Sequence, residues 1–308
     1  PAKITVFGAE QRTQDIYNAD VLNDILAHTV ITRTFEEITG KDIKHIHQVP
    51  VRFSEPEKEV YQKAISEFHA MRGNYFASTG NSRKDSMMRL IQQITLLLRI
   101  SAAPNTVKEY TGGMPVKIAK VMEMLQEMPD QIIAIGVRHK KVVDAYSAAI
   151  RKLMPERPLF VVTGDTTTLA QRRKLRKTLK ASGNGILLCT QQSLPSSVNF
   201  EFVNKVIIPE LHYNNSRMSQ FYMRFVRYTS REDKDIYFVT YLGSIESNQM
   251  QMVLAKEKIN LFMRGQEQDL DDIYKTFGVD YNLLETLMRR EENPEGVFEI
   301  RWGKQDIS

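Results

Sequence analysis

The feature that most constrains the fold is a series of short apolar runs that alternate with helical stretches from residue 112 onward. The runs are rich in β-branched residues and almost continuously apolar, which is typical of strands buried on both faces of a parallel sheet. They lie at 131–137, 159–164, 185–190, 205–210 and 235–242. We therefore expect an α/β fold in which helices cover both faces of a five-stranded parallel sheet.

The segment before this lobe, residues 1–111, has a different pattern. Residues 46–53, "IHQVPVRF", alternate like a half-buried strand, and Ser54 with Glu57 three residues later predicts the start of a helix. Residues 72–86 are polar and rich in Gly and Ser, which predicts an exposed loop before a helix over 87–100. We expect an N-terminal helical extension over 1–111 that carries one or more strands.

The lobe itself is expected over 112–265, and a C-terminal tail over 266–308. The tail has a helix–helix–strand pattern that ends in "VFEIRW". It is a packing brace or a docking segment, and base rates favour the brace.

Composition narrows the class of protein. The chain has 308 residues, 42 Lys and Arg against 37 Asp and Glu, and one cysteine, Cys189. A single cysteine excludes an internal disulfide and a cysteine-based zinc cluster, so we expect an intracellular, reducing compartment, the cytoplasm or the nucleus. The sequence predicts no membrane helix and no signal peptide. It starts at Pro1 without an initiator Met, which is consistent with processing or with a fragment.

Several motifs are absent from the sequence. It contains no Gly-x-x-x-x-Gly-Lys-Ser/Thr phosphate loop, no Gly-x-Ser-x-Gly, no His-Glu-x-x-His and no dinucleotide fingerprint. The chain therefore carries no complete hydrolytic or redox site of these kinds.

One candidate site lies in "QFYMRFVR". Gln220, Arg224 and Arg227 have i, i+4 and i+7 spacing, which places them on one face of a predicted helix. Two guanidinium groups on one face suit a polyphosphate, as an arginine finger does. The alternative is a solvated basic helix face whose apolar side packs into the core.

Two further segments suit phosphate contacts. In "QRRKLRKTLK", residues 171–180, six of ten residues are basic, so this helix either follows a nucleic-acid backbone or is a solvated surface helix. "TGDTTT", residues 163–168, follows a predicted strand and offers backbone N–H groups, although a plain turn with a cap at Thr168 fits equally well.

His45 and His47 alternate on one strand face, but no third metal ligand is evident, so we expect no metal site there. His139 and His212 point to no specific role.

The order of these segments resembles a known family. The segments are "LNDILAHTVITRTFEEITG", "IHQVPVRFSEPEKEVYQKA", "LLLRISAAP", "PVKIAKVMEML", "QIIAIGV", "VVTGDTTTLAQRR", "ILLCTQQSLPSSVNF", "VIIPELHYNNSRMSQ", "QFYMRFVR" and "YLGSIES". From about residue 20 to 265, the chain resembles the C-terminal, second RecA-like lobe of SWI/SNF-type superfamily-two helicases and DNA translocases. "QIIAIGV" stands at motif IV, "ILLCTQQSLPSSVNF" at motif V and "QFYMRFVR" at motif VI.

The resemblance implies roles for individual residues. Arg227 would be the arginine finger, Arg224 its partner, and Gln220 would orient the nucleotide or the arginines. The cofactor implied is ATP with Mg²⁺, which the first lobe would hold. The residues implied to contact duplex DNA, largely without sequence specificity, are Thr163, Gly164, Thr166, Arg172, Arg173, Thr190 and Gln191.

The chain departs from the family in two places. Residues 193–197, "SLPSS", lack the glycines of motif V, and Tyr228, Thr229 and Ser230 replace the Gly and Gln that follow motif VI. These departures indicate a divergent member, and a viral source is one reading. The first lobe, with its phosphate loop, is missing, so we expect this chain alone to be inactive as an ATP hydrolase.

Three functional hypotheses remain open. The first is the C-terminal lobe of an ATP-dependent DNA helicase or translocase, completed by an N-terminal lobe in cis or in trans. The second is a stand-alone, non-catalytic binding or adaptor module that kept the fold. The third keeps the two-lobed motor but takes RNA as its substrate.

Overall fold

The computed structural model describes residues 2–5, 8–11, 24, 40–41, 43–77, 79–164, 168–194, 199–212, 215–227, 229–230, 232–247, 250, 290–292 and 298–300. Two small antiparallel pairs lie near the two ends of the chain: β1 (Ala2–Thr5) with β2 (Gly8–Gln11), and β9 (Arg290–Glu292) with β10 (Phe298–Ile300). β10 confirms the predicted terminal strand, whereas the predicted tail helices lie outside the described residues.

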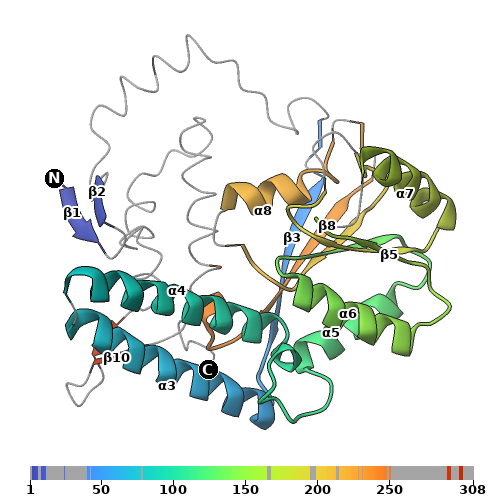
Figure 1. The fold of residues 1–308 in the computed structure, drawn as a ribbon. Coiled ribbons are helices and arrows are strands. Elements are labelled where there is room, and N and C mark those ends of the chain that lie inside the picture. Colours follow the sequence, from blue (N-terminus) through green and yellow to red (C-terminus); the bar gives the residue numbers. More distant parts are fainter. Residues whose placement is uncertain are drawn as a thin grey trace.

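The main body is a six-stranded, fully parallel sheet in the order β3-β8-β7-β4-β6-β5 (Figure 1). Its strands are β3 (Lys44–Val51), β4 (Ile133–Val137), β5 (Leu159–Val162), β6 (Ile186–Thr190), β7 (Lys205–Ile208) and β8 (Lys234–Tyr241). All five predicted strands are confirmed, and so is the α/β class. The strand count was one short, because β3 joins the sheet from the N-terminal segment.

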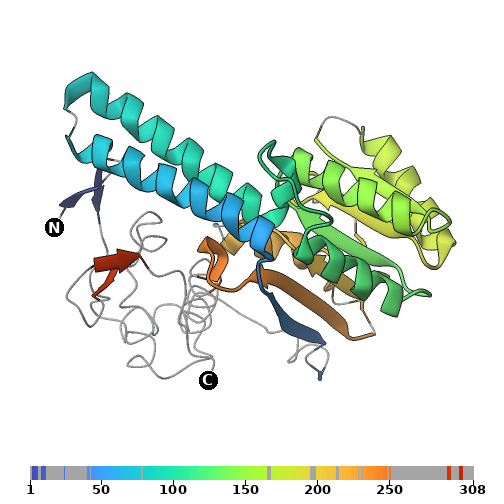
Figure 2. The ribbon, with the colours of Figure 1, turned by 90° about the horizontal axis from the view of Figure 1, so that it is seen from below.

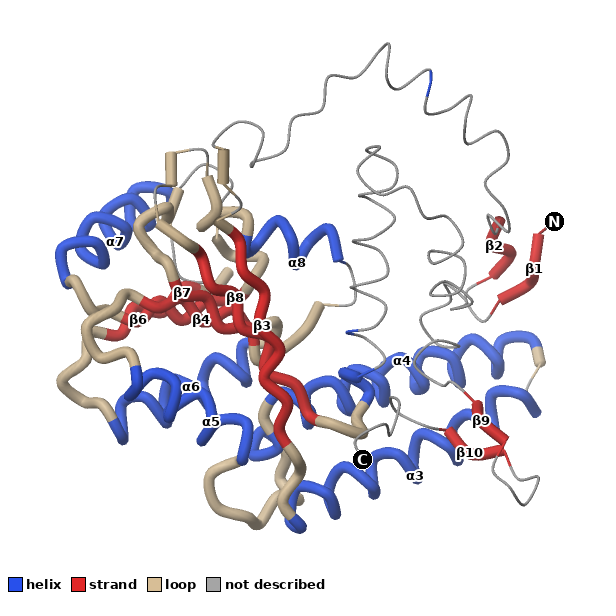
Figure 3. Tube along the Cα trace, turned by 180° about the vertical axis from the view of Figure 1, so that it is seen from behind, coloured by secondary structure: helices blue, strands red, loops and turns tan. Residues whose placement is uncertain are grey.

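β3 is an edge strand. It pairs with β8 alone, in a register that runs from Lys44 opposite Lys234 to Val51 opposite Tyr241 (Figure 3). His45, Gln48 and Pro50 of β3 are exposed, whereas Ile46 and Val49 are partly buried and Val51 is buried, which agrees with the alternation of this strand in the sequence.

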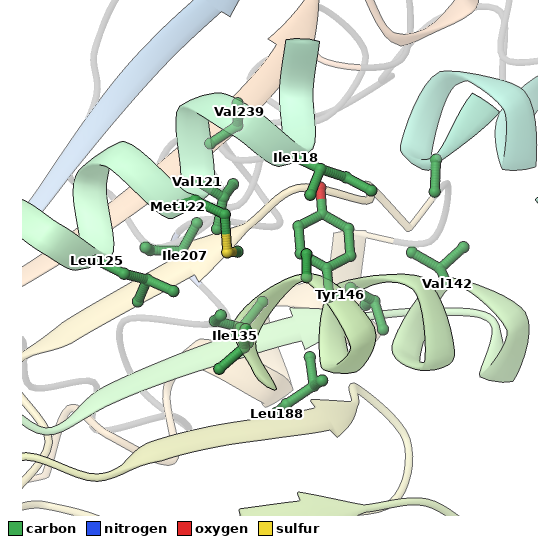
Figure 4. Close-up of a cluster of buried hydrophobic side chains, with 14 of the residues drawn as sticks. Ile118, Val121, Met122, Leu125, Ile135, Val142, Tyr146, Leu188, Ile207 and Val239 are labelled. Carbon is green, nitrogen blue, oxygen red and sulfur yellow. The ribbon is translucent and has the colours of Figure 1, made fainter. Parts of the chain in front are cut away.

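Helices cover both faces of the sheet. In β4, Ile133, Ile135 and Val137 belong to one buried cluster and Ala134 to another, as the two-residue period of a strand requires. The first cluster lies under α5 (Val116–Glu127) and α6 (Lys140–Leu153), where Tyr146 packs in the interior (Figure 4). The second lies under α7 (Leu169–Ser182) and α8 (Asn215–Tyr222).

The helices α3 (Glu55–Ala77) and α4 (Gly80–Ala102) form a long hairpin that extends away from the sheet (Figure 2). Phe68, Leu90 and Leu97 are buried between them, and a 3-10 turn, Pro104–Thr106, follows α4. The exposed loop predicted over 72–86 is wrong, because both helices continue through most of it. Packing between neighbouring helices stabilises helical turns that Gly, Ser and Asn disfavour locally.

The base of the hairpin is fixed to the lobe by Glu57, which is fully buried. Its Oε2 accepts hydrogen bonds from the Ser54 amide at 2.7 Å and the Ser54 hydroxyl at 2.8 Å, which confirms the predicted helix start. Its Oε1 accepts from the Val116 amide at 2.7 Å and the Tyr241 hydroxyl at 2.6 Å. One carboxylate therefore joins the N-termini of α3 and α5 to the end of β8.

In the described part of the chain, no helix combines the length and the apolar character that crossing a membrane requires.

Candidate functional site

The predicted arginine pair lies after a helix and not on it. α8 ends at Tyr222, so Gln220 lies in its last turn, and Arg224 and Arg227 lie in the segment that leads to β8. The i, i+4, i+7 helix face predicted for these three residues is therefore wrong. Backbone hydrogen bonds from Arg224 to Phe221 and from Phe225 to Tyr222 span only three residues, as in tight turns.

Aromatic packing fixes where this segment leaves the sheet. Phe221 and Phe225 are fully buried, with their rings in an edge-to-face contact at 5.4 Å. Phe221 lies directly over Gly136 of β4, where a Cβ atom would come within 2.2 Å of the ring. Because only glycine leaves room there, α8 packs closely against the middle of the sheet and sets the position of Arg224.

The second arginine is held by a serine turn. The Arg227 amide donates to Ser230 Oγ at 3.1 Å, and the Ser230 amide donates back to the Arg227 carbonyl at 2.7 Å. Ser230 therefore orders the backbone around the second arginine.

The two guanidinium groups are cationic, partly buried and close together. The Nε atoms of Arg224 and Arg227 are shielded from solvent and have no hydrogen-bond partner. Burial lowers the pKa of Arg224, and the positive charge of Arg227 lowers it further, against a small opposing effect of Cys189. Among the described residues, neither arginine forms an ion pair with a carboxylate. Two adjacent cations with unused buried donors suit an anionic ligand.

A second group of polar residues follows the carboxyl ends of β4 and β7. Glu210 is 2% exposed, and its Oε2 accepts from the amides of Arg138 at 2.6 Å and His139 at 3.1 Å, at the start of α6. Its Oε1 bonds to His139 Nδ1. The chain leaves β4 and β7 toward opposite sides of the sheet, and ligands of open α/β sheets bind at such a switch point.

This second group was missed from the sequence. His139 and Glu210 are far apart in the chain, and neither belongs to a recognisable motif. The available signal was positional, because each follows the carboxyl end of a predicted strand and those ends lie along one edge of the sheet.

The residues predicted to contact DNA fall into two groups. Thr190 is partly exposed and its hydroxyl bonds to Ser193 Oγ, and a Cβ atom added at Gly164 would lie 3.7 Å from that same serine oxygen. Thr163 and Gln191 are buried, and Gln191 donates from Nε2 to the carbonyls of Gly136 at 3.2 Å and Glu210 at 2.7 Å. Gln191 therefore joins β4 to β7 from the end of β6.

Three more predicted residues lie at or near α7. Arg173 is exposed on this helix. Thr166 and the side chain of Arg172 lie outside the part that the structure describes. The helix itself begins with the predicted cap at Thr168, whose hydroxyl accepts from the Gln171 amide while the Gln171 side chain accepts from the Thr168 amide.

His45 and His47 pair with carboxylates and not with each other. His47 Nε2 lies 2.6 Å from Asp235 Oδ1, and His45 Nε2 lies 3.8 Å from Asp233 Oδ2. Within the described residues, no group of three or more His, Cys, Asp or Glu side chains could hold a metal ion.

The order of the parallel sheet and the helices on both of its faces define a RecA-like α/β lobe. Comparison with solved structures gives the same fold. The C-terminal part of the Fun30 ATPase domain superposes with a TM-score of 0.55 at 14% identity, covering 79% of this chain and 98% of that one. The Sulfolobus solfataricus SWI2/SNF2 ATPase C-terminal domain superposes with a TM-score of 0.56 at 16% identity, covering 80% and 98%.

The Sulfolobus solfataricus SWI2/SNF2 ATPase core in complex with dsDNA matches with a TM-score of 0.57 at 15% identity, covering 90% of this chain and 57% of that one. No protein-family model and no curated protein sequence matches the chain. The chain thus has the fold of the C-terminal lobe of SWI2/SNF2 ATPases, at a sequence identity of only 14–16%.

Proposed function

We propose that this chain is the C-terminal lobe of an ATP-dependent DNA translocase or helicase, completed by an N-terminal RecA-like lobe in cis or in trans. The observation that carries the proposal is the arginine pair, Arg224 and Arg227. Both side chains are partly buried, their Nε donors are unused, and no carboxylate among the described residues neutralises them. A protein interior keeps such groups where a ligand supplies the missing charge.

The chemistry of the pair suits the triphosphate of ATP bound with Mg²⁺. Arg227 acts as the arginine finger and stabilises the charge that develops on the transferred phosphoryl group. Arg224 adds a second cation beside it, and Gln220, exposed in the last turn of α8, orients the nucleotide or the arginines. The phosphate loop and the Mg²⁺ ligands belong to the partner lobe, so this chain alone does not hydrolyse ATP.

Duplex DNA is the proposed substrate along which the complete protein moves. The solved core in complex with dsDNA has a lobe of this fold, which supports DNA as the ligand of the corresponding surface here. Thr190, Gly164 and Arg173 are available for backbone contacts, to which Thr166 and Arg172 add in the proposal. The buried Gln191 holds its loop in place through its hydrogen bonds to Gly136 and Glu210, and Thr163 is buried beside the strand end. Contacts of this kind position a protein without reading sequence.

The test is Arg227→Ala in the complete two-lobed protein. Removing an arginine finger lowers the DNA-stimulated ATPase rate by about 10³-fold or more. Arg227→Lys keeps the charge but loses the planar fork, and we expect it to restore only part of the rate. Arg151→Ala, at an exposed position on α6, is the matched control. A full ATPase rate in Arg227→Ala contradicts the assignment.

The size of the native polypeptide shows how the site is completed. An antibody to this chain that detects a species of roughly twice 35.5 kDa means that the partner lobe is in cis. A species near 35.5 kDa means that a separate protein supplies the lobe, or that the chain is a binding module without ATPase activity.

The binding-module alternative rests on residues 193–197, which lack the glycines of motif V. It predicts DNA affinity that does not change with nucleotide or with Arg227. The RNA alternative is decided by competition between duplex DNA and duplex RNA of equal length.

A further inference from the structure

The positive charge of the chain is concentrated on α7. This helix carries six of the 42 basic side chains and no acidic one. Since the chain has 37 acidic residues, everything outside α7 has one more acidic than basic side chain. The whole positive excess of the molecule therefore lies on one helix of 14 residues.

Four of these cations form one outer surface, the basic face: Arg173, Lys174, Lys177 and Lys180, all exposed. The residues 173, 177 and 180 follow i, i+4, i+7 spacing, so they lie in a stripe along the helix. Among the described residues, no carboxylate forms an ion pair with any of the four. A solvated helix face normally mixes both signs of charge, and this one does not.

The opposite side of α7 fixes the basic face in place. Leu179 is fully buried and Leu175 packs against the same core cluster. Arg176 joins α7 to the segment that precedes β7. Its Nε donates to the Asn199 carbonyl at 2.5 Å, and its Nη2 donates to Glu201 Oε1 at 2.8 Å. Its guanidinium also lies 5.4 Å from the centre of the Phe202 ring. The carboxylate of Glu201 is thus engaged by Arg176, and not by the four residues of the basic face.

The dimensions of the basic face fit a phosphate backbone. Seven residues of helix separate Arg173 from Lys180, which at about 1.5 Å per residue is about 10 Å. Phosphates of one DNA strand advance about 3.4 Å each along the duplex axis, so the stripe spans about three of them. The N-terminus of α7 is closed by the Thr168 cap and follows the loop after β5, at the same edge of the sheet as Thr190.

We propose that the basic face of α7 continues the contact with the backbone of duplex DNA beyond the loops at the carboxyl ends of the strands, and that it binds DNA independently of nucleotide. It extends the contact from Arg173 through Lys177 to Lys180, along the side of the lobe. The choice of duplex DNA rests on the proposed function. The single-sign face itself follows from the sequence and the helix of the structure.

The experiment measures the affinity of the 308-residue chain for a fluorescent duplex over a range of salt concentrations, without nucleotide. Lys177→Gln/Lys180→Gln removes two charges and keeps good helix formers. We expect about tenfold weaker binding near 0.1 M salt, and a log–log salt dependence less steep by about 2 units, since each phosphate contact contributes about 0.9. The control, Arg151→Gln/Lys152→Gln, removes two exposed charges from the last turn of α6, on the other face of the sheet, and leaves both quantities unchanged.

The inference is overturned if the variant keeps the wild-type affinity and salt dependence, or if the wild-type chain binds no duplex. It is also overturned if poly-glutamate displaces the duplex and itself binds more tightly, because the face then serves an acidic protein segment. Lys177→Gln alone, with an expected change of about 1 unit in the salt dependence, repeats the test with a smaller perturbation. Circular dichroism and melting curves establish that each variant is folded.

A failure of the proposed function can be distinguished from a failure of this inference. If Arg227→Ala leaves ATP hydrolysis unchanged while the α7 variant still weakens DNA binding, the arginine-finger assignment is wrong and the basic face stands. If Arg227→Ala abolishes ATP hydrolysis and the α7 variant binds DNA normally, the arginine-finger assignment stands and the inference about the basic face is wrong.

Discussion

Lys117 and Glu246 form an ion pair that is closed off from water. Lys117 is fully buried and Glu246 is 1% exposed. The Lys117 Nζ donates to Glu246 at 2.8 and 2.6 Å and to the Pro209 carbonyl at 3.0 Å. Burial lowers the pKa of Lys117 and raises that of Glu246 to about 7, and the attraction between them opposes both shifts. All three donor positions of the ammonium are used, which favours the charged pair.

Breaking this ion pair should lower the stability of the folded protein. Glu246→Gln leaves a buried lysine without its counter-charge, and we expect it to lower the free energy of unfolding by about 3 kcal/mol or more. Glu123→Gln, which breaks the exposed pair between Lys120 and Glu123, should cost less than about 1 kcal/mol. Urea unfolding of the two variants makes the comparison.

The double variant Lys117→Met/Glu246→Gln separates charge from packing. It removes both charges and should recover part of the lost stability, because the uncompensated lysine is gone. If Glu246→Gln costs no more than the exposed control, the pair is not the stabilising contact described above.

At the scale of elements, hydrophobic pattern and cap residues predicted most of the lobe. The strands β4, β6 and β7 are buried along nearly their whole length, so each appears in the sequence as a continuous apolar run. The caps at Ser54 and Thr168 have local partners three residues away. The errors arose where distant contacts decide the structure. The hairpin α3–α4 overrides the polar composition of 72–86, and β3 joins the sheet through pairing with a strand far along the chain.

The sequence predicted which residues form the candidate site, but it did not predict how they are arranged. Gln220, Arg224 and Arg227 were found from their spacing, but that spacing implied a helix which ends at Tyr222. The turn that replaces it depends on buried Phe225 and on Ser230, contacts that periodicity does not encode. The contact between His139 and Glu210 could not be predicted either, because periodicity does not encode contacts between residues far apart in the chain.

Asp235 lies on β8 and contacts His47 of β3 and Lys205 of β7. We expect protonation of this carboxylate at low pH to destabilise the β3 side of the sheet. Burial raises the pKa of Asp235, but hydrogen bonds from Lys205 and His47 lower it more, so the pKa lies below its ordinary value. A lowered folded-state pKa stabilises the protein above the unfolded pKa of about 3.9, and this stabilisation is lost as the pH falls through the folded-state value.

Asp235→Asn should therefore be less stable than the wild type at pH 7, and the difference should narrow below about pH 4. Thermal unfolding between pH 2 and pH 7 measures it. Asp144→Asn, at an exposed position on α6, serves as the control and should follow the wild type. A gap between Asp235→Asn and the wild type that is constant over this range would refute the assignment.

At the scale of the whole molecule, Glu57 decides whether the hairpin and the lobe unfold together. Its carboxylate bonds to the start of α3, the start of α5 and the end of β8 at once. Ile245, which follows β8, is buried in the hairpin cluster, and its amide donates a hydrogen bond to the Tyr61 hydroxyl at 2.8 Å. These contacts make the hairpin base continuous with the sheet.

We expect Glu57→Ala to destabilise the protein by about 2–4 kcal/mol, because it leaves several buried donors without an acceptor. Hydrogen exchange should become faster at the base of the hairpin and at the start of α5 together. Glu59→Ala, at an exposed position one residue beyond Lys58, should change neither. Faster exchange confined to α3 would show that the hairpin opens independently of the lobe.

The pairing of β3 with β8 also has a consequence for how the polypeptide is made. His47 and Asp235 are partners although 188 positions separate them, so β3 leaves the ribosome long before the strand that it pairs with. The strands β4 to β7 can assemble during synthesis, whereas the edge formed by β3 has to wait for β8. We therefore expect the pairing of β3 to be a late and slow step of folding, during which its unpaired edge can bind a chaperone or a neighbouring nascent chain.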